Sequence, residues 1–389
     1  MLSLYDENDI VEVKNHEKRR KKLIKFFIFV IVAGIIAGLY FTRDMWYDKI
    51  RGIGRQYNTI INTGILAEGN FPIEIDGEYN YQLRQTQNSF IILSDIHIFF
   101  YNTDGTLIRK RQHTYTNAIL QAENGKALIY ENGGDNFCIE DEDGIIYEDT
   151  FSNNIMFARI SPEGYTAVVT TSENYDCEII VLDNKGKIIY ERKCMERASD
   201  ISFINQSGGC VVSYLMAENG SLTTAVQKID FSESIEDWTS PGLDTAGLDV
   251  YGYSDGAFVV GINACGYINE NGQISSYYRY DGDLKGGASV NGMSAVIINN
   301  DDRRKYVMVL FNGNSSEPLV IDLGQEAVDV TVYDNLAYVM CKEEIRAYDF
   351  EGEVRSKATI SDSYSGFARS KDYIFLKGYN KIDRIDYES

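Results

Sequence analysis

Proline and histidine are both scarce in this sequence. Their scarcity argues against a proline-rich stalk and against a site built on paired histidines. The 4 prolines among 389 residues exclude a Pro-rich or mucin-like stalk. The 3 histidines, His16, His97 and His113, offer no pair at a metal-ligand or catalytic spacing. The sequence also lacks the nucleophile elbow of many hydrolases and the glycine-rich loop that cradles phosphates.

The acidic run Glu140-Asp141-Glu142-Asp143-Gly144 comes nearest to a metal-binding motif. It does not fit the calcium loop of an EF-hand, because alignment on Gly144 puts Ile139 at the first ligand position and Thr150 at the last. We interpret the run as an acidic hairpin turn. We predict no metal site, no bound cofactor and no catalytic residue in this chain.

Cysteine is present but forms no recognisable framework. None of the 6 cysteines belongs to a C-x-x-C pair, and none has a histidine at a metal-ligand spacing. Most lie within apolar strand patterns, such as Gly209-Cys210-Val211-Val212, which is typical of small buried side chains. An exported location would permit disulfides, but the spacing does not indicate any particular bridge.

Basic residues are outnumbered, with 37 Lys and Arg against 58 Asp and Glu, for a net charge of −21. Five of them form one run, Lys18-Arg19-Arg20-Lys21-Lys22, so the remainder of the chain is more acidic still. Nucleic-acid binding requires a basic surface, and we therefore exclude nucleic acid as a partner.

A short turn that recurs about every forty residues is the most informative feature of the chain. Asp-Gly and Asn-Gly between apolar strands are strong hairpin signals, and we interpret these turns as type I′. A period of this length with several strands per repeat indicates a β-propeller. The turns are Asn102-Thr103-Asp104-Gly105, Glu142-Asp143-Gly144, Asn184-Lys185-Gly186, Glu270-Asn271-Gly272, Phe311-Asn312-Gly313 and Phe350-Glu351-Gly352.

One repeat, residues 157–192, shows the whole unit as four strands separated by turns, which is one propeller blade. Aligning its two central strands with the rest of the chain gives eight copies, so we predict an all-β, eight-bladed propeller. Seven blades remain the alternative if one copy is an insertion. The last copy stops after its third strand, and we predict that Phe71–Asp76 supplies the missing fourth strand and closes the ring.

Residues 23–41, from Leu23 to Phe41, predict an N-terminal transmembrane helix. The segment reads LIKFFIFVIVAGIIAGLYF and would span roughly 28 Å as a helix, close to the ~30 Å hydrocarbon core of a bilayer. Lys25, its only charge, lies near the start and can reach the interface. A cleaved signal peptide would have a shorter apolar core, and a buried helix would have polar faces.

The flanking charges predict the orientation and the domain boundaries. Lys18, Arg19, Arg20, Lys21 and Lys22 precede the span, so the positive-inside rule makes residues 1–22 a cytoplasmic tail and places residues 71–389 outside the cell membrane. Residues 42–70 form a juxtamembrane stalk with a short amphipathic pattern, which we expect to lie on the membrane or to pack on the propeller.

The repeats resemble known propeller families. The turn Ser161-Pro162-Glu163-Gly164 and the strand after it resemble WD40-like and periplasmic translocation propellers, and Asp183-Asn184-Lys185-Gly186-Lys187-Ile188-Ile189-Tyr190 is similar to the pyrroloquinoline-quinone-like repeat. The whole layout resembles an uncharacterised family of single-pass, membrane-anchored propeller proteins of anaerobic Gram-positive bacteria. The resemblance implies binding rather than chemistry. The WD strand end is absent, and Asp237-Trp238 is expected in a loop.

We therefore expect a non-catalytic binding or scaffold protein of the cell envelope, attached to the membrane by one helix. Its partners would be another envelope protein or cell-wall material. The alternative is an enzyme, either a quinone-dependent dehydrogenase or a glycan-active propeller. A dehydrogenase would need a Trp that stacks on its cofactor, and neither Trp46 nor Trp238 is placed for that role.

Overall fold

The computed structural model describes residues 60–61, 70–75, 81–218, 220–232, 235–313, 317–361 and 363–386. The predicted tail 1–22, the predicted span 23–41 and most of the predicted stalk 42–70 lie outside these ranges. Within the described ranges, no helix has the length and apolar character needed to cross a membrane.

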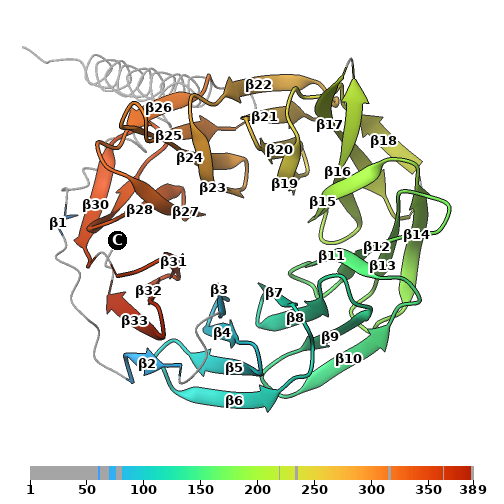
Figure 1. Cartoon of the computed structure of the whole chain (residues 1–389), viewed down its shortest axis with the longest axis horizontal. Coiled ribbons are helices and arrows are strands. Elements are labelled where there is room, and N and C mark those ends of the chain that lie inside the picture. Colours follow the sequence, from blue (N-terminus) through green and yellow to red (C-terminus); the bar gives the residue numbers. More distant parts are fainter. Residues whose placement is uncertain are drawn as a thin grey trace, which may run out of the picture. The chain divides into compact units, whose positions relative to one another are not determined.

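The described residues form eight antiparallel sheets arranged in a ring, which confirms the eight-bladed propeller and rules out the seven-bladed alternative (Figure 1). Each blade has four strands, which are ordered outward from the central channel. The first strand of a blade, here called the inner strand, lies nearest the channel. The turn between the first and second strands is called the inner turn, and the turn between the third and fourth strands is called the outer turn.

Blades one to four follow one another along the chain. Their strands are β3 (Gln82–Gln85), β4 (Ser89–Leu93), β5 (His97–Asn102) and β6 (Leu107–Gln112); β7 (Ala118–Glu123), β8 (Lys126–Glu131), β9 (Asn136–Glu140) and β10 (Ile145–Thr150); β11 (Ile155–Ile160), β12 (Thr166–Thr170), β13 (Cys177–Leu182) and β14 (Ile188–Cys194); and β15 (Arg197–Ile204), β16 (Gly209–Glu218), β17 (Ser221–Asp230) and β18 (Ile235–Thr239).

Blades five to eight complete the ring. Their strands are β19 (Gly247–Tyr253), β20 (Gly256–Gly261), β21 (Ala264–Asn269) and β22 (Ile274–Arg279); β23 (Asp283–Val290), β24 (Met293–Asn300), β25 (Lys305–Asn312) and β26 (Leu319–Asp322); β27 (Ala327–Tyr333), β28 (Leu336–Cys341), β29 (Glu344–Tyr348) and β30 (Val354–Thr359); and β31 (Gly366–Arg369), β32 (Tyr373–Lys377), β33 (Lys381–Asp386) and β2 (Ile73–Glu74).

The ring is closed by strands from both ends of the propeller sequence, as predicted. β2 pairs antiparallel with β33, with Ile73 opposite Ile382. Ile73 and Ile75 are buried, and the ring of Phe71 lies 6.2 Å from that of Phe90 in blade one. A further strand, β1 (Ile60–Ile61), pairs parallel with β30 at the outer edge of blade seven, so this part of the predicted stalk joins the propeller.

The outer turns of blades one, three, five and seven are hairpins of a different type from the one predicted. In the turn of blade three, the N–H of Gly186 donates to the carbonyl of Asp183 at 3.0 Å, and φ is positive only at the glycine, at 82°. The strand register shifts by one residue just before the turn, between Val181 and Leu182. These features define a type I turn followed by a glycine bulge, and the prediction of type I′ was wrong.

The first residue of this turn stabilises it with its side chain. Asp183 Oδ1 accepts the N–H groups of Lys185 and Lys187, both at 2.9 Å, which explains why Asp or Asn recurs three residues before the glycine. The glycine also contacts the neighbouring blade, because a Cβ at Gly186 would lie 3.0 Å from the ring of Tyr147. Turns in blades five and seven repeat the side-chain bonds at Asn269 and Asp349.

Trp238 in blade four occupies the same place as Tyr147 in blade two. It lies in the fourth strand β18, not in a loop as predicted, and a Cβ at Gly272 of the next blade would lie 3.1 Å from its indole ring. The fourth repeat, which has no glycine between its third and fourth strands, is therefore a complete blade.

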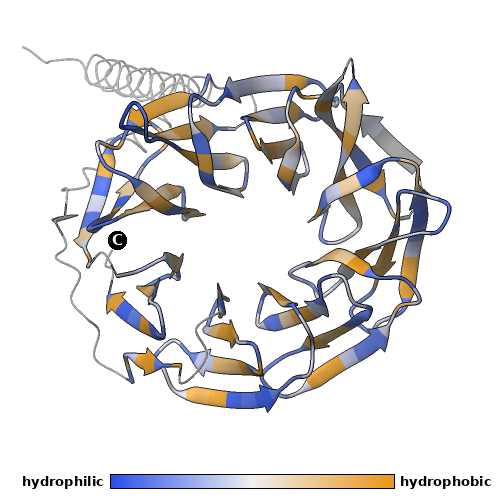
Figure 2. Ribbon diagram, in the orientation of Figure 1, coloured by the Kyte–Doolittle hydropathy of each residue, from blue (hydrophilic) through white to orange (hydrophobic). Residues whose placement is uncertain are grey.

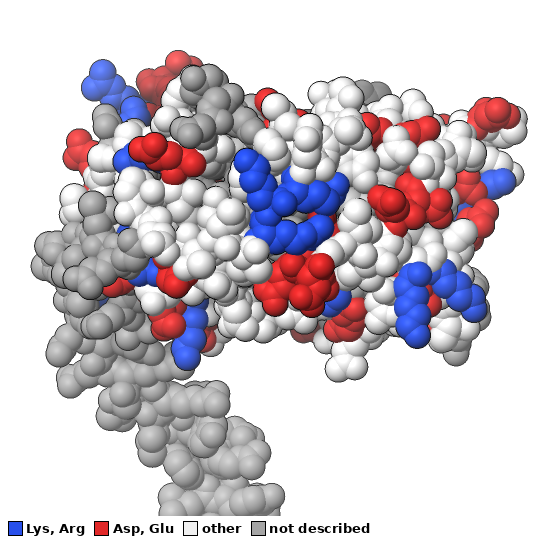
Figure 3. All heavy atoms as spheres, turned by 90° about the horizontal axis from the view of Figure 1, so that it is seen from below, with Lys and Arg blue, Asp and Glu red and all other residues white. Residues whose placement is uncertain are grey.

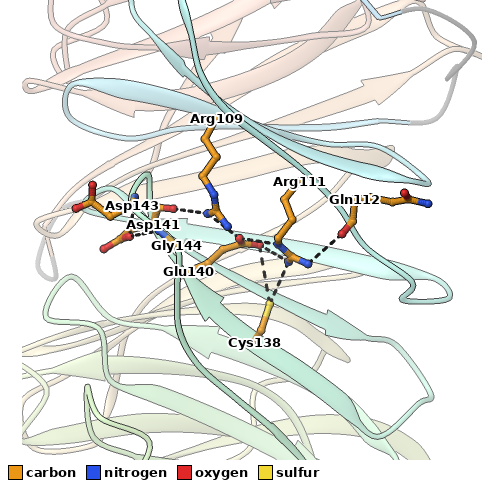
Figure 4. Close-up of polar contacts among 8 residues, drawn as sticks. All are labelled: Arg109, Arg111, Gln112, Cys138, Glu140, Asp141, Asp143 and Gly144. Atoms are coloured by element: carbon orange, nitrogen blue, oxygen red, sulfur yellow. Dashed lines mark hydrogen bonds and ion pairs between the residues drawn. The ribbon is translucent and has the colours of Figure 1, made fainter.

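Hydrophobic residues of the second and third strands pack between adjacent blades (Figure 2). All six cysteines are buried and free, in agreement with the prediction of small apolar core residues. Ionic contacts also join adjacent blades. Glu140 in β9 is fully buried and accepts hydrogen bonds from Arg109 and Arg111 of β6, each at 2.9 Å to Oε2 (Figure 4). On this wall of the ring, basic side chains lie directly beside acidic ones (Figure 3).

Candidate functional site

The site residues predicted from the sequence concern the membrane and lie outside the described residues. They are the topology-determining residues Lys18, Arg19, Arg20, Lys21 and Lys22, and the ends of the span, Leu23 and Phe41. Of the histidines, His113 is buried and its Nε2 lies 2.9 Å from the carbonyl of Ser94, so it has a structural role. In the described part of the chain, no group of three or more His, Cys, Asp or Glu side chains could hold a metal ion.

A polar cavity of about 320 Å³ lies in the channel, where the inner strands of five consecutive blades meet. Blades one to five each contribute to it through β3, β7, β11, β15 and β19. Five charged residues line it, namely Arg84, Glu123, Arg159, Asp200 and Asp249.

Arg159 and Asp200 form the central ion pair of this cavity. Arg159 Nη2 lies 2.8 Å from Asp200 Oδ1, and the other carboxylate oxygen accepts the N–H of Val250 from the next blade at 2.8 Å. The Asp200 side chain is only 4% exposed. Burial raises its pKa to about 6, although the positive charge of Arg159 acts in the opposite direction. Asp200 of blade four therefore contacts both neighbouring blades, through its ion pair with Arg159 and its hydrogen bond with Val250.

The other three charged groups of the cavity, Arg84, Glu123 and Asp249, remain available to a ligand. Asp249 lies 4.0 Å from Arg159 and its side chain is 47% exposed. Arg84 Nη1 donates to the carbonyl of Leu83 at 3.1 Å, and no carboxylate of the described residues lies within ion-pair distance of it. Enclosure by the channel walls lowers the pKa of Arg84, and repulsion from Arg159 adds to this effect. Arg84 can therefore donate hydrogen bonds to an anionic or carbonyl group, and Asp249 can accept them.

The aspartates are placed by a feature that repeats around the ring. In blades four, five and seven the inner strand shifts register by one residue, and the residue after the shift is Asp200, Asp249 or Asp329. Such a bulge bends the strand and redirects the side chain that follows it. Asp329 also joins blades, because its Oδ2 accepts the N–H of Phe367 at 3.1 Å.

Our sequence analysis missed these residues, although the signal was present. The tripeptides Ala198-Ser199-Asp200, Gly247-Leu248-Asp249 and Ala327-Val328-Asp329 share a small residue two positions before the aspartate. Aligning the repeats on their inner strands, as well as on their two central strands, would have revealed them.

The comparisons with known proteins agree with this architecture. The chain belongs to the family of unknown function DUF5711, whose model matches residues 69–386. That match covers the whole propeller, including the strand that closes it. No curated protein matches the sequence significantly.

Several solved propellers are similar to this member of DUF5711. The computationally designed Ika8 protein has a TM-score of 0.62 at 10% identity, with 81% of this chain and 98% of that chain covered. BamB from Moraxella catarrhalis has a TM-score of 0.55 at 11% identity, with 83% and 100% covered. A chain of a mitotic checkpoint complex has a TM-score of 0.52 at 10% identity, with 86% and 95% covered. At these identities, the likeness establishes the fold alone.

Proposed function

We propose that this protein is a non-catalytic binding protein of the cell envelope, anchored by residues 23–41 with its propeller outside the membrane. The observation that carries the proposal is the polar cavity in the channel, where Arg84 and Asp249 are available to a ligand. A concave site with a few convergent polar groups is the usual form of a binding site. The apolar span and the basic run before it support the location.

The ligand of this cavity would carry both an acceptor for Arg84 and a donor for Asp249. Peptide termini, amide groups and amino sugars all have that combination, and each occurs in envelope proteins or in cell-wall material. The net charge of −21 is in keeping with a partner that is not a strong polyanion.

Crosslinking in living cells tests the proposal. A photoreactive amino acid in place of Gln121, which lines the cavity, should form an adduct with the ligand or partner. Arg84→Met in the same protein should reduce that adduct at least fivefold, because the main donor group is lost. Arg279→Met is the matched control, since Arg279 lies on the fourth strand β22 and its side chain is 63% exposed. Equal adduct formation by both variants would contradict a channel site.

An enzyme remains the second candidate, and one observation favours a glycan-active form of it. Asp200 and Asp249 are two carboxylates beside the same arginine, and burial raises the pKa of both. The ion pair of Asp200 with Arg159 and its hydrogen bond with Val250 favour a structural role over that of a catalytic acid. Hydrolysis of cell-wall glycan by the wild-type protein, abolished by Asp249→Asn, would favour the enzyme over the binding protein.

A further inference from the structure

A second and larger cavity, of about 550 Å³, lies among the inner turns of blades three to six. It lies next to the channel cavity, and both are lined by β15 or by the turn that follows it. Asp200 to Phe203 line the first cavity, and Phe203 to Ser207 line the second. Its volume falls within the range of roughly 300–1,000 Å³ that is usual for small-molecule sites.

The inner turn of blade four, at the edge of this cavity, has an unusual backbone. Asn205, Gln206 and Ser207 have φ values of 52°, 53° and 66°, so three consecutive residues other than glycine are left-handed. L-residues rarely adopt this conformation even singly. Strained backbone that the surrounding structure holds in place is a feature of ligand sites.

A neighbouring blade holds this strained turn in position. The buried hydroxyl of Ser207 lies 2.7 Å from Ser161 Oγ and 2.5 Å from Glu163 Oε2, both in the inner turn of blade three. The N–H of Gly208 donates to the carbonyl of Asn205 at 3.0 Å. The turn is therefore fixed, while the side chains of Asn205 and Gln206 are exposed.

The chemistry of the lining restricts the ligand. No Lys, Arg or His lines the cavity, whereas Glu163 and Asp255 do, so anions such as phosphates are disfavoured. The side-chain amides of Asn205, Gln206 and Asn291 each offer a donor and an acceptor. None of these side-chain amides is hydrogen bonded within the described protein. Tyr253 also lines the cavity and stacks on Tyr267, with ring centroids 6.1 Å apart and planes 7° apart.

We propose that this cavity binds a neutral oligosaccharide. Amide side chains pair with adjacent sugar hydroxyls because each supplies both a donor and an acceptor, and a carboxylate accepts hydrogen bonds from neighbouring hydroxyls. Tyr253, which also lines the cavity, supplies apolar surface beside these polar groups. This site is separate from the one proposed in the channel and does not depend on the membrane anchor.

Isothermal titration of the full chain in a detergent that contains no sugar tests the proposal. The probes are chitotriose with N-acetylated rings, maltotriose, and a sulfated trisaccharide as the anionic comparison. We expect at least one neutral trisaccharide to bind and the sulfated one to bind at least tenfold more weakly. Gln206→Glu combined with Asn291→Asp should weaken the neutral ligand about tenfold, because amide donors are replaced by carboxylates of the same shape.

Asn335→Asp is the matched control. Asn335 is an exposed asparagine in the inner turn of blade seven with φ of 62°, and it does not line the cavity. It should leave binding unchanged, as should Arg84→Met, which separates this site from the channel site. Failure of every neutral trisaccharide to bind would overturn the proposal. Equal weakening by Asn335→Asp, or binding only of glycan fragments that carry a peptide, would also overturn it.

Discussion

At the scale of single residues, three buried acidic side chains of this propeller act across the boundaries between blades. Asp200, Asp329 and Glu140 each bond to a neighbouring blade with an engaged carboxylate. Removing the partner of a buried, hydrogen-bonded charge lowers the stability of the protein. These residues therefore favour the pairing of blade surfaces that supply those partners. The pairing of Asp200 with Val250 also positions the channel cavity.

Asp200 should give the protein a specific dependence of stability on pH. Its pKa in the folded protein is about 6, above the unfolded value of about 3.9, so the folded state keeps a proton that the unfolded state has lost between these values. The stabilisation that protonated Asp200 contributes to the free energy of unfolding is therefore present below about pH 4 and is lost as the pH rises to about 6. The loss amounts to about 3 kcal/mol.

Asp200→Asn removes this titration while retaining an acceptor for Val250. In denaturant unfolding of residues 69–389 at several pH values, the wild-type stability relative to Asp200→Asn should fall between pH 4 and pH 6.5. A difference between the two proteins that stays constant over this range would mean that Asp200 is ionised throughout.

Substitution of Glu140 should lower the stability of the protein more than substitution of any other glutamate of blade two. Glu140→Gln leaves Arg109 and Arg111 beside a fully buried neutral group, and we expect a loss of about 3 kcal/mol in the free energy of unfolding. Glu142→Gln, in the adjacent exposed turn, is the matched control and should change stability by less than about 0.5 kcal/mol. Equal effects of the two substitutions would show that the ion pair contributes nothing to the contact between blades.

At the scale of elements, the sequence predicted the strands well because each blade repeats the same local signals. The periodic apolar strands and the glycine turns gave all eight blades and the closing strand. The turn type was wrong because Asp-Gly and Asn-Gly fit both a type I′ turn and a type I turn with a bulge. The register shifts before Gly186 and the Asp183 side-chain bonds favour the second, and neither can be read from the dipeptide.

The candidate sites were harder to predict than the fold. Arg84 and Asp249 come from blades one and five, and only closure of the ring brings them to one cavity. The prediction that Trp238 lies in a loop was wrong for a related reason. The fourth repeat has no glycine turn to mark the start of its fourth strand, and the packing of Trp238 on Gly272 is not evident from the sequence.

The closing strand should contribute far more to stability than its length suggests. A protein that begins at Gly77 loses β2, the buried side chains of Ile73 and Ile75, and the packing of Phe71 on Phe90 and Phe375. At roughly 1.5–3 kcal/mol for each large apolar side chain, the expected loss is a few kcal/mol. That is a large share of a typical total of about 5–15 kcal/mol.

Thermal unfolding of proteins beginning at Gly69 and at Gly77 measures this contribution. The longer protein should be soluble and unfold cooperatively, since the closed ring contains its own core. Equal melting temperatures would mean that blade eight is stable without its fourth strand. Aggregation of the longer protein, relieved only by residues 42–68, would show that the stalk belongs to the propeller.

At the scale of the whole molecule, we propose a closed propeller attached to a single predicted membrane helix. The five basic residues Lys18, Arg19, Arg20, Lys21 and Lys22 are expected to hold the N-terminus in the cytoplasm. Replacing all five with Gln should allow a fraction of the molecules to insert in the opposite orientation. An unchanged orientation in every molecule would show that these residues do not determine the topology.

The central claim is that the propeller lies outside the membrane, where its cavities can reach envelope components. The most direct test places an epitope tag after Ser389 and treats intact protoplasts with an external protease. We predict that the tagged protein is found in the membrane fraction and that the protease removes the tag completely while cytoplasmic proteins survive. A tag that is protected until the membrane is broken, or a tagged protein that is released without detergent, would contradict the account.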